Sequence, residues 1–143
     1  MDFHLTLTMP SHSRFLRVVR AVIDELGLVY GFPDELCRGL TLAVDEAMAN
    51  IIRHAYKGRY DQKVVFNCDV DADRMEFTLL DWGEAPDMAR ICAQPLDDVS
   101  LGGRGTHLIK AVMDEVSYER VPGGNRLRMI KHLPAAKVNA GKE

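Results

Sequence analysis

The sequence predicts an α+β domain in which a mixed, mostly antiparallel sheet carries helices packed on one face. Along the 143 residues the expected order of elements is β-α-α-β-β-α-β-β. Two pairs of consecutive strands are joined by short turns and are expected to pair antiparallel, whereas parallel neighbours need a long crossover connection. We expect one domain over residues 1–134 and a frayed tail over residues 135–143.

The first two elements are a strand and an amphipathic helix. Apolar and polar residues alternate in DFHLTLTMP up to Pro10, which predicts a short strand. Apolar residues then recur at helical spacing from Phe15 to Leu26, and Ser11 is the expected N-cap. Charged residues such as Arg17 interrupt this helix, so it cannot cross a bilayer, and we expect a cytoplasmic protein with no membrane partner.

Two hairpins are predicted further along the chain. QKVVFNCDVD and RMEFTLLDW are joined by a polar turn at residues 71–73, and EVSYERV is joined to NRLRMIKHL across PGG. Between the hairpins, SLGGRGTHLIKAVMDEV places a glycine cluster directly before a helix that is expected to end near Asp114.

The composition excludes several classes of function. The chain is 47% hydrophobic and 27% charged, as in ordinary globular proteins, and its net charge is −3. Lysines and arginines are scattered, so direct nucleic-acid binding is not expected. Cys37, Cys68 and Cys92 lie far apart and no histidines have metal-ligand spacing, which is typical of idle thiols in a reducing compartment.

The second helix carries the first candidate site residues. It is predicted to run from Pro33 near its first turn to Gly58 as its C-terminal stop. Glu46 and Asn50 are i, i+4 neighbours at the edge of the apolar stripe, where they either line a cleft or form a solvated boundary. Asparagine is a poor helix former, so helix propensity does not account for its position inside this helix. His54 is expected near the helix end, close to the C-terminal dipole.

The stretch LLDWGEAPD carries the second candidate. Asp81 ends an apolar strand, and Gly83 follows two residues later. One interpretation is an ordinary turn. The other is a carboxylate that accepts a hydrogen bond from a ligand amine, beside a glycine that lets a flat group approach the backbone.

The glycine cluster is the third candidate. Gly102, Gly103 and Gly105 precede a helix whose first N–H groups have no partner within the helix. Such a helix start is either a tight turn or an anion site, where Arg104 adds a charged donor and Thr106 a hydroxyl. A Walker-type phosphate loop is disfavoured because the GKS or GKT ending is absent.

Taken in order, the three motifs resemble those of the GHKL (histidine kinase-like) ATPase superfamily. AVDEAMANIIRHAY looks like its N box, LLDWGEAPD like its first glycine box and GGRGTHLIKAVMDEV like its second. The chain is most similar to the branch of small anti-sigma factor serine/threonine-protein kinases. The similarity runs from Phe3 to Leu133, includes the ending GGNRLRMIKHL, and implies a Bergerat-type two-layer sandwich.

The resemblance also implies a role for each matching position. Asn50 would coordinate Mg²⁺, and Glu46 would act as the general base. Asp81 would bind the adenine amino group of ATP, with Gly83 beneath the base. The ATP phosphates would be wrapped by Gly103, Arg104, Gly105 and Thr106.

The function that follows from the resemblance is partner switching. The chain would be an ATP- and Mg²⁺-binding anti-sigma factor that phosphorylates serine or threonine on a STAS-domain anti-anti-sigma protein. A sigma factor would be the competing partner, and members of this branch often form homodimers. The alternatives are a non-catalytic ATP-binding anti-sigma module, a detached histidine kinase-type ATPase domain, and a structural α+β domain whose glycines only form turns.

Overall fold

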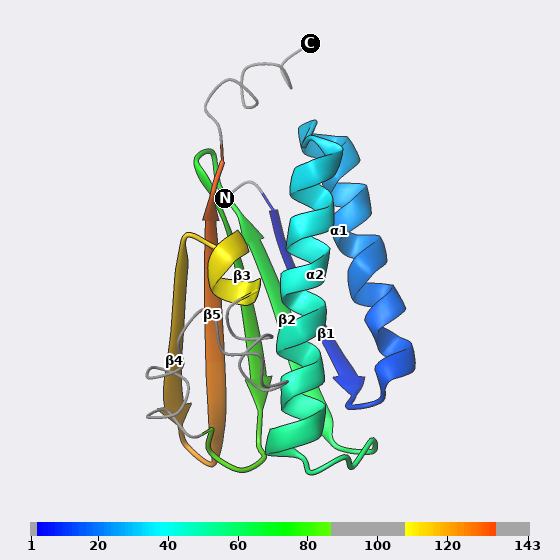
Figure 1. Ribbon diagram of the computed structural model, residues 1–143, viewed down its shortest axis with the longest axis vertical. Coiled ribbons are helices and arrows are strands. Elements are labelled where there is room, and N and C mark those ends of the chain that lie inside the picture. Colours follow the sequence, from blue (N-terminus) through cyan, green and yellow to red (C-terminus); the bar gives the residue numbers. More distant parts are fainter. Residues whose placement is uncertain (1–2, 87–107, 134–143) are drawn as a thin grey trace.

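The computed structural model describes residues 3–86 and 108–133, which form a five-stranded sheet with helices on one face (Figure 1). The strands are β1 (Phe3–Pro10), β2 (Lys63–Val70), β3 (Arg74–Asp81), β4 (Glu115–Val121) and β5 (Gly124–His132). Their order in the sheet is β1-β2-β3-β5-β4, and all four pairings are antiparallel. The predicted α+β class and both hairpins are confirmed, although no parallel pair occurs among these strands.

The helices form the second layer. A short 3₁₀ turn η1 (Ser13–Phe15) leads into α1 (Leu16–Tyr30), and α2 (Asp34–Asn50) continues into a π-helical turn η2 (Ile51–Ala55). A further helical segment at residues 108–112 lies on the same face of the sheet (Figure 1). Within the described residues no helix is both long and apolar enough to span a membrane.

The alternation of side chains along β3 decides where its polar end lies. Met75, Phe77 and Leu79 are completely buried under the helices, and Phe77 stacks on Phe66 of β2 with ring centroids 5.7 Å apart. Residues two apart in a strand share a face of the sheet. Asp81 therefore continues this apolar row and faces the helix layer at the end of the strand.

The expected N-cap of the first helix is wrong. Ser11 is fully buried, and its backbone N–H donates to the Gln62 carbonyl at 2.7 Å, which extends the contact between β1 and β2. Its hydroxyl donates to the carbonyl of Arg59 at 2.7 Å. His12 is the residue that caps η1, because its ring accepts the Arg14 N–H at 3.1 Å.

The second helix begins and ends as the sequence predicts, but its last part is π-helical. Pro33 is the N-cap, and the acidic residues in the first turn stabilise the helix by interacting with the positive end of its dipole. Gly58 terminates the element with φ of 80°, and its N–H donates to the Ile52 carbonyl at 2.8 Å. His54 lies in the last turn, as expected. The π turn widens the helix just after Asn50, a feature frequent at functional sites.

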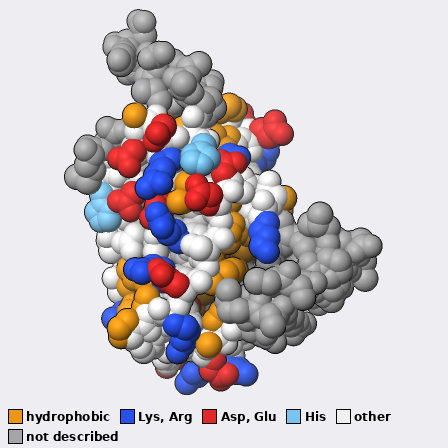
Figure 2. Space-filling view, turned by 90° about the vertical axis from the view of Figure 1, so that its left-hand side faces the viewer, with side chains coloured by type: hydrophobic (Ala, Val, Ile, Leu, Met, Phe, Trp, Pro, Cys, Tyr) orange, Lys and Arg blue, Asp and Glu red, His pale blue; other side chains and the backbone are white. Residues whose placement is uncertain are grey.

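The opposite face of the sheet is polar. Figure 2 views the molecule from the β4 edge of the sheet, where acidic and basic side chains are interspersed and no single sign dominates. Cross-strand ion pairs on the face away from the helices include Arg128 with Glu76 at 3.0 Å and Arg126 with Glu119.

Candidate functional site

Asp81 is a buried carboxylate with one oxygen atom held and the other unengaged by the described residues. It is 4% exposed, at the end of β3. Its Oδ1 atom accepts the Gly83 N–H at 3.0 Å and the Asn125 side-chain amide at 2.8 Å. No described residue donates to Oδ2. A buried acceptor that no described residue pairs suits a ligand that brings an N–H group, because leaving such an atom without a donor is costly.

The Asn125 amide is itself fixed by a third strand. Asn125 stands opposite Asp81 in the β3–β5 register and opposite Arg120 in the β4–β5 register. The Arg120 guanidinium donates to the Asn125 Oδ1 atom at 2.5 Å. The three side chains thus form one row across β3, β5 and β4 on the helix-facing side of the sheet.

The charge state of Asp81 is set by opposing effects. Burial raises the pKa of this carboxyl above its ordinary value, because the charged form loses solvation. The hydrogen bonds from Asn125 and from the Gly83 N–H, and the charge of Arg120, act in the opposite direction. These donors reduce the rise in the pKa of Asp81 but do not cancel it, since burial is the largest effect.

Gly83 is required by the contact between the end of the second helix and the end of β3. A Cβ atom at this position would stand 2.3 Å from the Ala55 carbonyl oxygen. The same oxygen accepts the Glu84 N–H at 2.8 Å. Next to this contact, the Tyr56 hydroxyl donates to the Lys63 carbonyl at 2.5 Å and accepts the Trp82 N–H at 2.7 Å. The glycine thus serves backbone packing, and its expected place beneath a ligand stays a prediction.

Glu46 and Asn50 lie one turn apart near the C-terminal end of α2. Both are half-buried, at the edge of a stripe that includes the buried Ala43 and Ala47. The Asn50 Oδ1 atom accepts a hydrogen bond from Arg53 Nη2 at 2.8 Å. The carboxamide oxygen is therefore oriented and has a cationic partner before any ligand arrives.

The fold brings the first two candidate motifs to the same end of the molecule. The end of η2 touches Gly83 through Ala55, and Asn50 is the last residue of α2 before η2. Figure 1 shows this end of α2 beside the end of β3. The third motif, Gly102 to Thr106, lies outside the described residues, as do His107 and Cys92.

The residues present fit a purine amine better than a protein-held metal cluster. The Oδ2 atom of Asp81 can accept one N–H of an amine at the end of the sheet. Among residues 3–86 and 108–133 no group of three or more His, Cys, Asp or Glu side chains could hold a metal ion. A single amide oxygen such as that of Asn50 suits Mg²⁺, which usually keeps water and phosphate oxygens as its other ligands.

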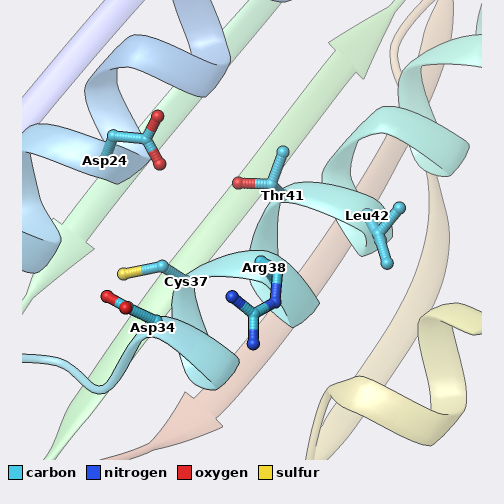
Figure 3. Close-up of a pocket in the computed structure, with 6 residues that line it drawn as sticks. All are labelled: Asp24, Asp34, Cys37, Arg38, Thr41 and Leu42. Carbon is cyan, nitrogen blue, oxygen red and sulfur yellow. The ribbon is translucent and has the colours of Figure 1, made fainter.

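A separate hollow of about 400 Å³ lies between α1 and α2 at the opposite end of α2 (Figure 3). None of the candidate site residues within the described part of the chain lines it. It is lined by Asp24, Asp34, Cys37, Arg38, Thr41 and Leu42. Burial is the main reason why the pKa of the Cys37 thiol is raised, which disfavours the reactive thiolate.

Sequence reasoning did not predict three residues that form hydrogen bonds around the candidate site: Arg53, Arg120 and Asn125. The two-residue turn at Pro122 and Gly123 fixes Arg120 opposite Asn125, so that contact could have been found. An asparagine in a predicted strand was a second signal, because asparagine is depleted in strands.

Comparison with known proteins places this geometry in a family context. Residues 9–131 match the family described as the histidine kinase-like ATPase domain. The chain is 25% identical to the serine-protein kinase RsbW of Bacillus velezensis, and the alignment covers 96% of this chain and 91% of that kinase. It is 29% identical to the serine-protein kinase RsbW of Halalkalibacterium halodurans, over 94% of this chain and 86% of that kinase.

Solved structures support the same architecture. The RsbU and RsbW domains of a Mycobacterium tuberculosis protein match with a TM-score of 0.66 at 16% identity, over 94% of this chain. This chain spans only 34% of that one. The histidine kinase domain of a blue-light activated kinase from Erythrobacter litoralis matches with a TM-score of 0.58 at 17% identity, over 94% of this chain and 66% of that one. At these identities the likeness concerns the fold.

Proposed function

The chain belongs to the histidine kinase-like ATPase domain family, and on that premise we propose that it is an ATP-dependent serine/threonine-protein kinase of the anti-sigma type. ATP binding is the first part of the proposal. Kinase activity on a partner protein is the second, and the relatives that match over nearly the full length of this chain, which are named serine-protein kinases, support it.

The observation that carries the proposal is the buried Asp81 carboxylate at the end of β3. Its Oδ1 atom is held by two N–H donors while Oδ2 has no partner among the described residues. An ionised carboxylate can only accept hydrogen bonds, so it complements the 6-amino group of adenine. Gly103, Arg104, Gly105 and Thr106 are proposed to bind the phosphates.

In the proposed reaction Glu46 accepts the proton of the attacking serine or threonine hydroxyl. The hydroxyl oxygen forms a bond to the γ-phosphorus, the bond from that phosphorus to the β–γ bridging oxygen breaks, and ADP leaves. Asn50 is proposed to hold Mg²⁺, which, when bound, neutralises charge on the phosphates. Positioning and charge neutralisation account for most of the acceleration in such transfers.

The proposed substrate is a STAS-domain anti-anti-sigma protein, and the proposed competing partner is a sigma factor. Both suggestions rest on the resemblance to anti-sigma kinases, as do a cytoplasmic location and a homodimer. Direct nucleic-acid binding is not part of the proposal, because acidic and basic side chains are interspersed on the face in Figure 2.

The proposal is tested by incubating the purified chain with ATP, Mg²⁺ and a STAS-domain protein from the same genome, followed by mass spectrometry of the STAS protein. The expected result is one phosphoryl group on serine or threonine that survives acid. An acid-labile phosphoryl group would favour the detached histidine kinase-type domain instead. Binding of ATP with no transfer to any STAS protein would favour the non-catalytic anti-sigma module.

A further inference from the structure

We propose that Arg120 and Asn125 are positioning residues that fix the Asp81 carboxylate for adenine, and that this row of three side chains sets the choice of base. The inference rests on the proposed function, because it assumes that Asp81 meets the base of a nucleotide. It adds two residues on β4 and β5 that the three sequence motifs do not include.

The Asn125 amide is held in one orientation by Arg120. A guanidinium group can only donate hydrogen bonds, and Arg120 donates to the Asn125 Oδ1 atom at 2.5 Å. The amide oxygen therefore points to Arg120, and the NH₂ group points to Asp81. A flipped amide would place N–H donors against the guanidinium and an oxygen against the carboxylate.

The Asn125 NH₂ group binds both Asp81 and the backbone after Gly83. It donates to Asp81 Oδ1 at 2.8 Å and to the Glu84 carbonyl at 3.0 Å. Asn125 is only 6% exposed, so water does not readily replace these bonds. The amide thus holds both the carboxylate and the backbone that follows Gly83.

The orientation of the Asp81 carboxyl group bears on which purine base it can bind. Two N–H donors fix the orientation of the Asp81 carboxyl group through Oδ1, and no described residue donates to Oδ2, which is the atom proposed to meet the ligand. Adenine presents an amine donor at its 6 position, whereas 6-oxo purines present an acceptor there. A site with a buried acceptor rejects a ligand that lacks the matching donor.

The backbone supports the same arrangement. A Cβ atom at Gly124, next to Asn125, would stand 2.3 Å from the Asp81 carbonyl oxygen. The start of β5 therefore approaches the end of β3 more closely than a residue with a side chain would permit. This close approach brings the Asn125 amide within reach of Asp81.

The experiment compares the dissociation constants of ATP and inosine triphosphate, measured by calorimetry. Inosine has a carbonyl and a ring N–H in place of the adenine amine and ring nitrogen. The variants are Arg120→Met, Asn125→Leu and the control Arg128→Met. Arg128 also lies on β5 but binds Glu76 on the outer face of the sheet at 3.0 Å.

We expect wild type to favour ATP over inosine triphosphate. Asn125→Leu should raise the dissociation constant of ATP about tenfold to a hundredfold, and Arg120→Met should raise it about threefold to tenfold. The dissociation constant of inosine triphosphate should change much less in both variants. Arg128→Met should keep the wild-type ratio of the two dissociation constants, that of inosine triphosphate to that of ATP. Arg120 is exposed, so its substitution tests the inference even if Asn125→Leu fails to fold.

Two results would overturn the inference while leaving the proposed function in place. One is an unchanged ratio in both variants, and the other is an equal loss of affinity for both nucleotides, which indicates a general structural role. If wild-type protein binds neither nucleotide, the proposed function fails and the inference fails with it.

Discussion

Gly83 and Ala55 are in such close contact that a Cβ atom at position 83 would stand 2.3 Å from the Ala55 carbonyl oxygen. The contact joins the π-helical end of the second helix to the end of β3. It brings the helix that carries Glu46 and Asn50 to the strand that carries Asp81. The geometry of the candidate site therefore depends on a backbone contact that only glycine permits.

Gly83→Ala should destabilise the protein, because the new methyl group overlaps backbone that cannot rotate away. We expect a loss of about 1–3 kcal/mol and a fall in the thermal midpoint of roughly 3–10 °C. Circular dichroism melting measures this. The matched control is Gly39→Ala inside α2, where a Cβ would meet Val112 at an ordinary 3.4 Å and should not destabilise. Equal midpoints for wild type and Gly83→Ala would contradict the packing account.

The Asp81 carboxylate should make stability depend on pH in a defined direction. Burial raises its folded-state pKa, with Asn125, the Gly83 N–H and Arg120 opposing that effect. The folded state then holds this proton more tightly than the unfolded state does. Stability is therefore lost as pH rises from the unfolded pKa of about 4 through the folded pKa.

Asp81→Asn removes this titration and retains an oxygen that can accept from Asn125. The difference in unfolding free energy, variant minus wild type, should increase as pH rises from about 4 to about 7. Urea unfolding at several pH values gives this difference. A flat difference, or one that decreases with pH, would show that Asp81 is not held as described.

Asn50→Ala should remove the Mg²⁺-dependent part of ATP binding and leave the Mg²⁺-independent part. The amide oxygen is the only hard ligand that the proposed function assigns to the protein. Arg53→Met is the control, because it removes the donor 2.8 Å from Asn50 Oδ1 while keeping that oxygen. Calorimetric titration with and without Mg²⁺ separates the two parts. Retained Mg²⁺ dependence in Asn50→Ala would assign the metal to another residue.

Glu46→Gln should separate binding from chemistry. The substitution keeps the shape of the side chain and removes the base, so phosphoryl transfer should fall by about a hundredfold to ten-thousandfold. ATP affinity should change little. Single-turnover transfer to a STAS-domain protein gives the rate. A rate close to that of wild type would exclude Glu46 as the general base.

Local patterns were sufficient to predict most elements of this fold. Alternation up to Pro10 predicted β1, and the polar turn at residues 71–73 predicted the β2–β3 hairpin. Such signals act between residues close in sequence. The predicted N-cap at Ser11 was wrong because its N–H donates to the Gln62 carbonyl and its hydroxyl donates to the Arg59 carbonyl. Tertiary contacts here override a local preference.

The candidate site was less accessible to sequence reasoning. Asp81 and Asn125 are 44 residues apart, and their contact depends on the pairing of β3 with β5. No turn between those strands fixes that register. The π turn after Asn50 has no periodic signal either. The sequence therefore predicted Asp81 and Asn50 as candidate site residues but not the side chains that form hydrogen bonds with them.

The most direct test of the central claim is thermal unfolding of wild type and Asp81→Asn with ATP, with Mg²⁺ and with both. At about 100 times its Kd, ATP should stabilise wild type by about 2.7 kcal/mol and raise its midpoint by roughly 5–10 °C. The shift should require Asp81 and increase with Mg²⁺. No shift at millimolar ATP, or an equal shift in Asp81→Asn, would contradict the claim that this carboxylate is the base-binding group of an ATP site.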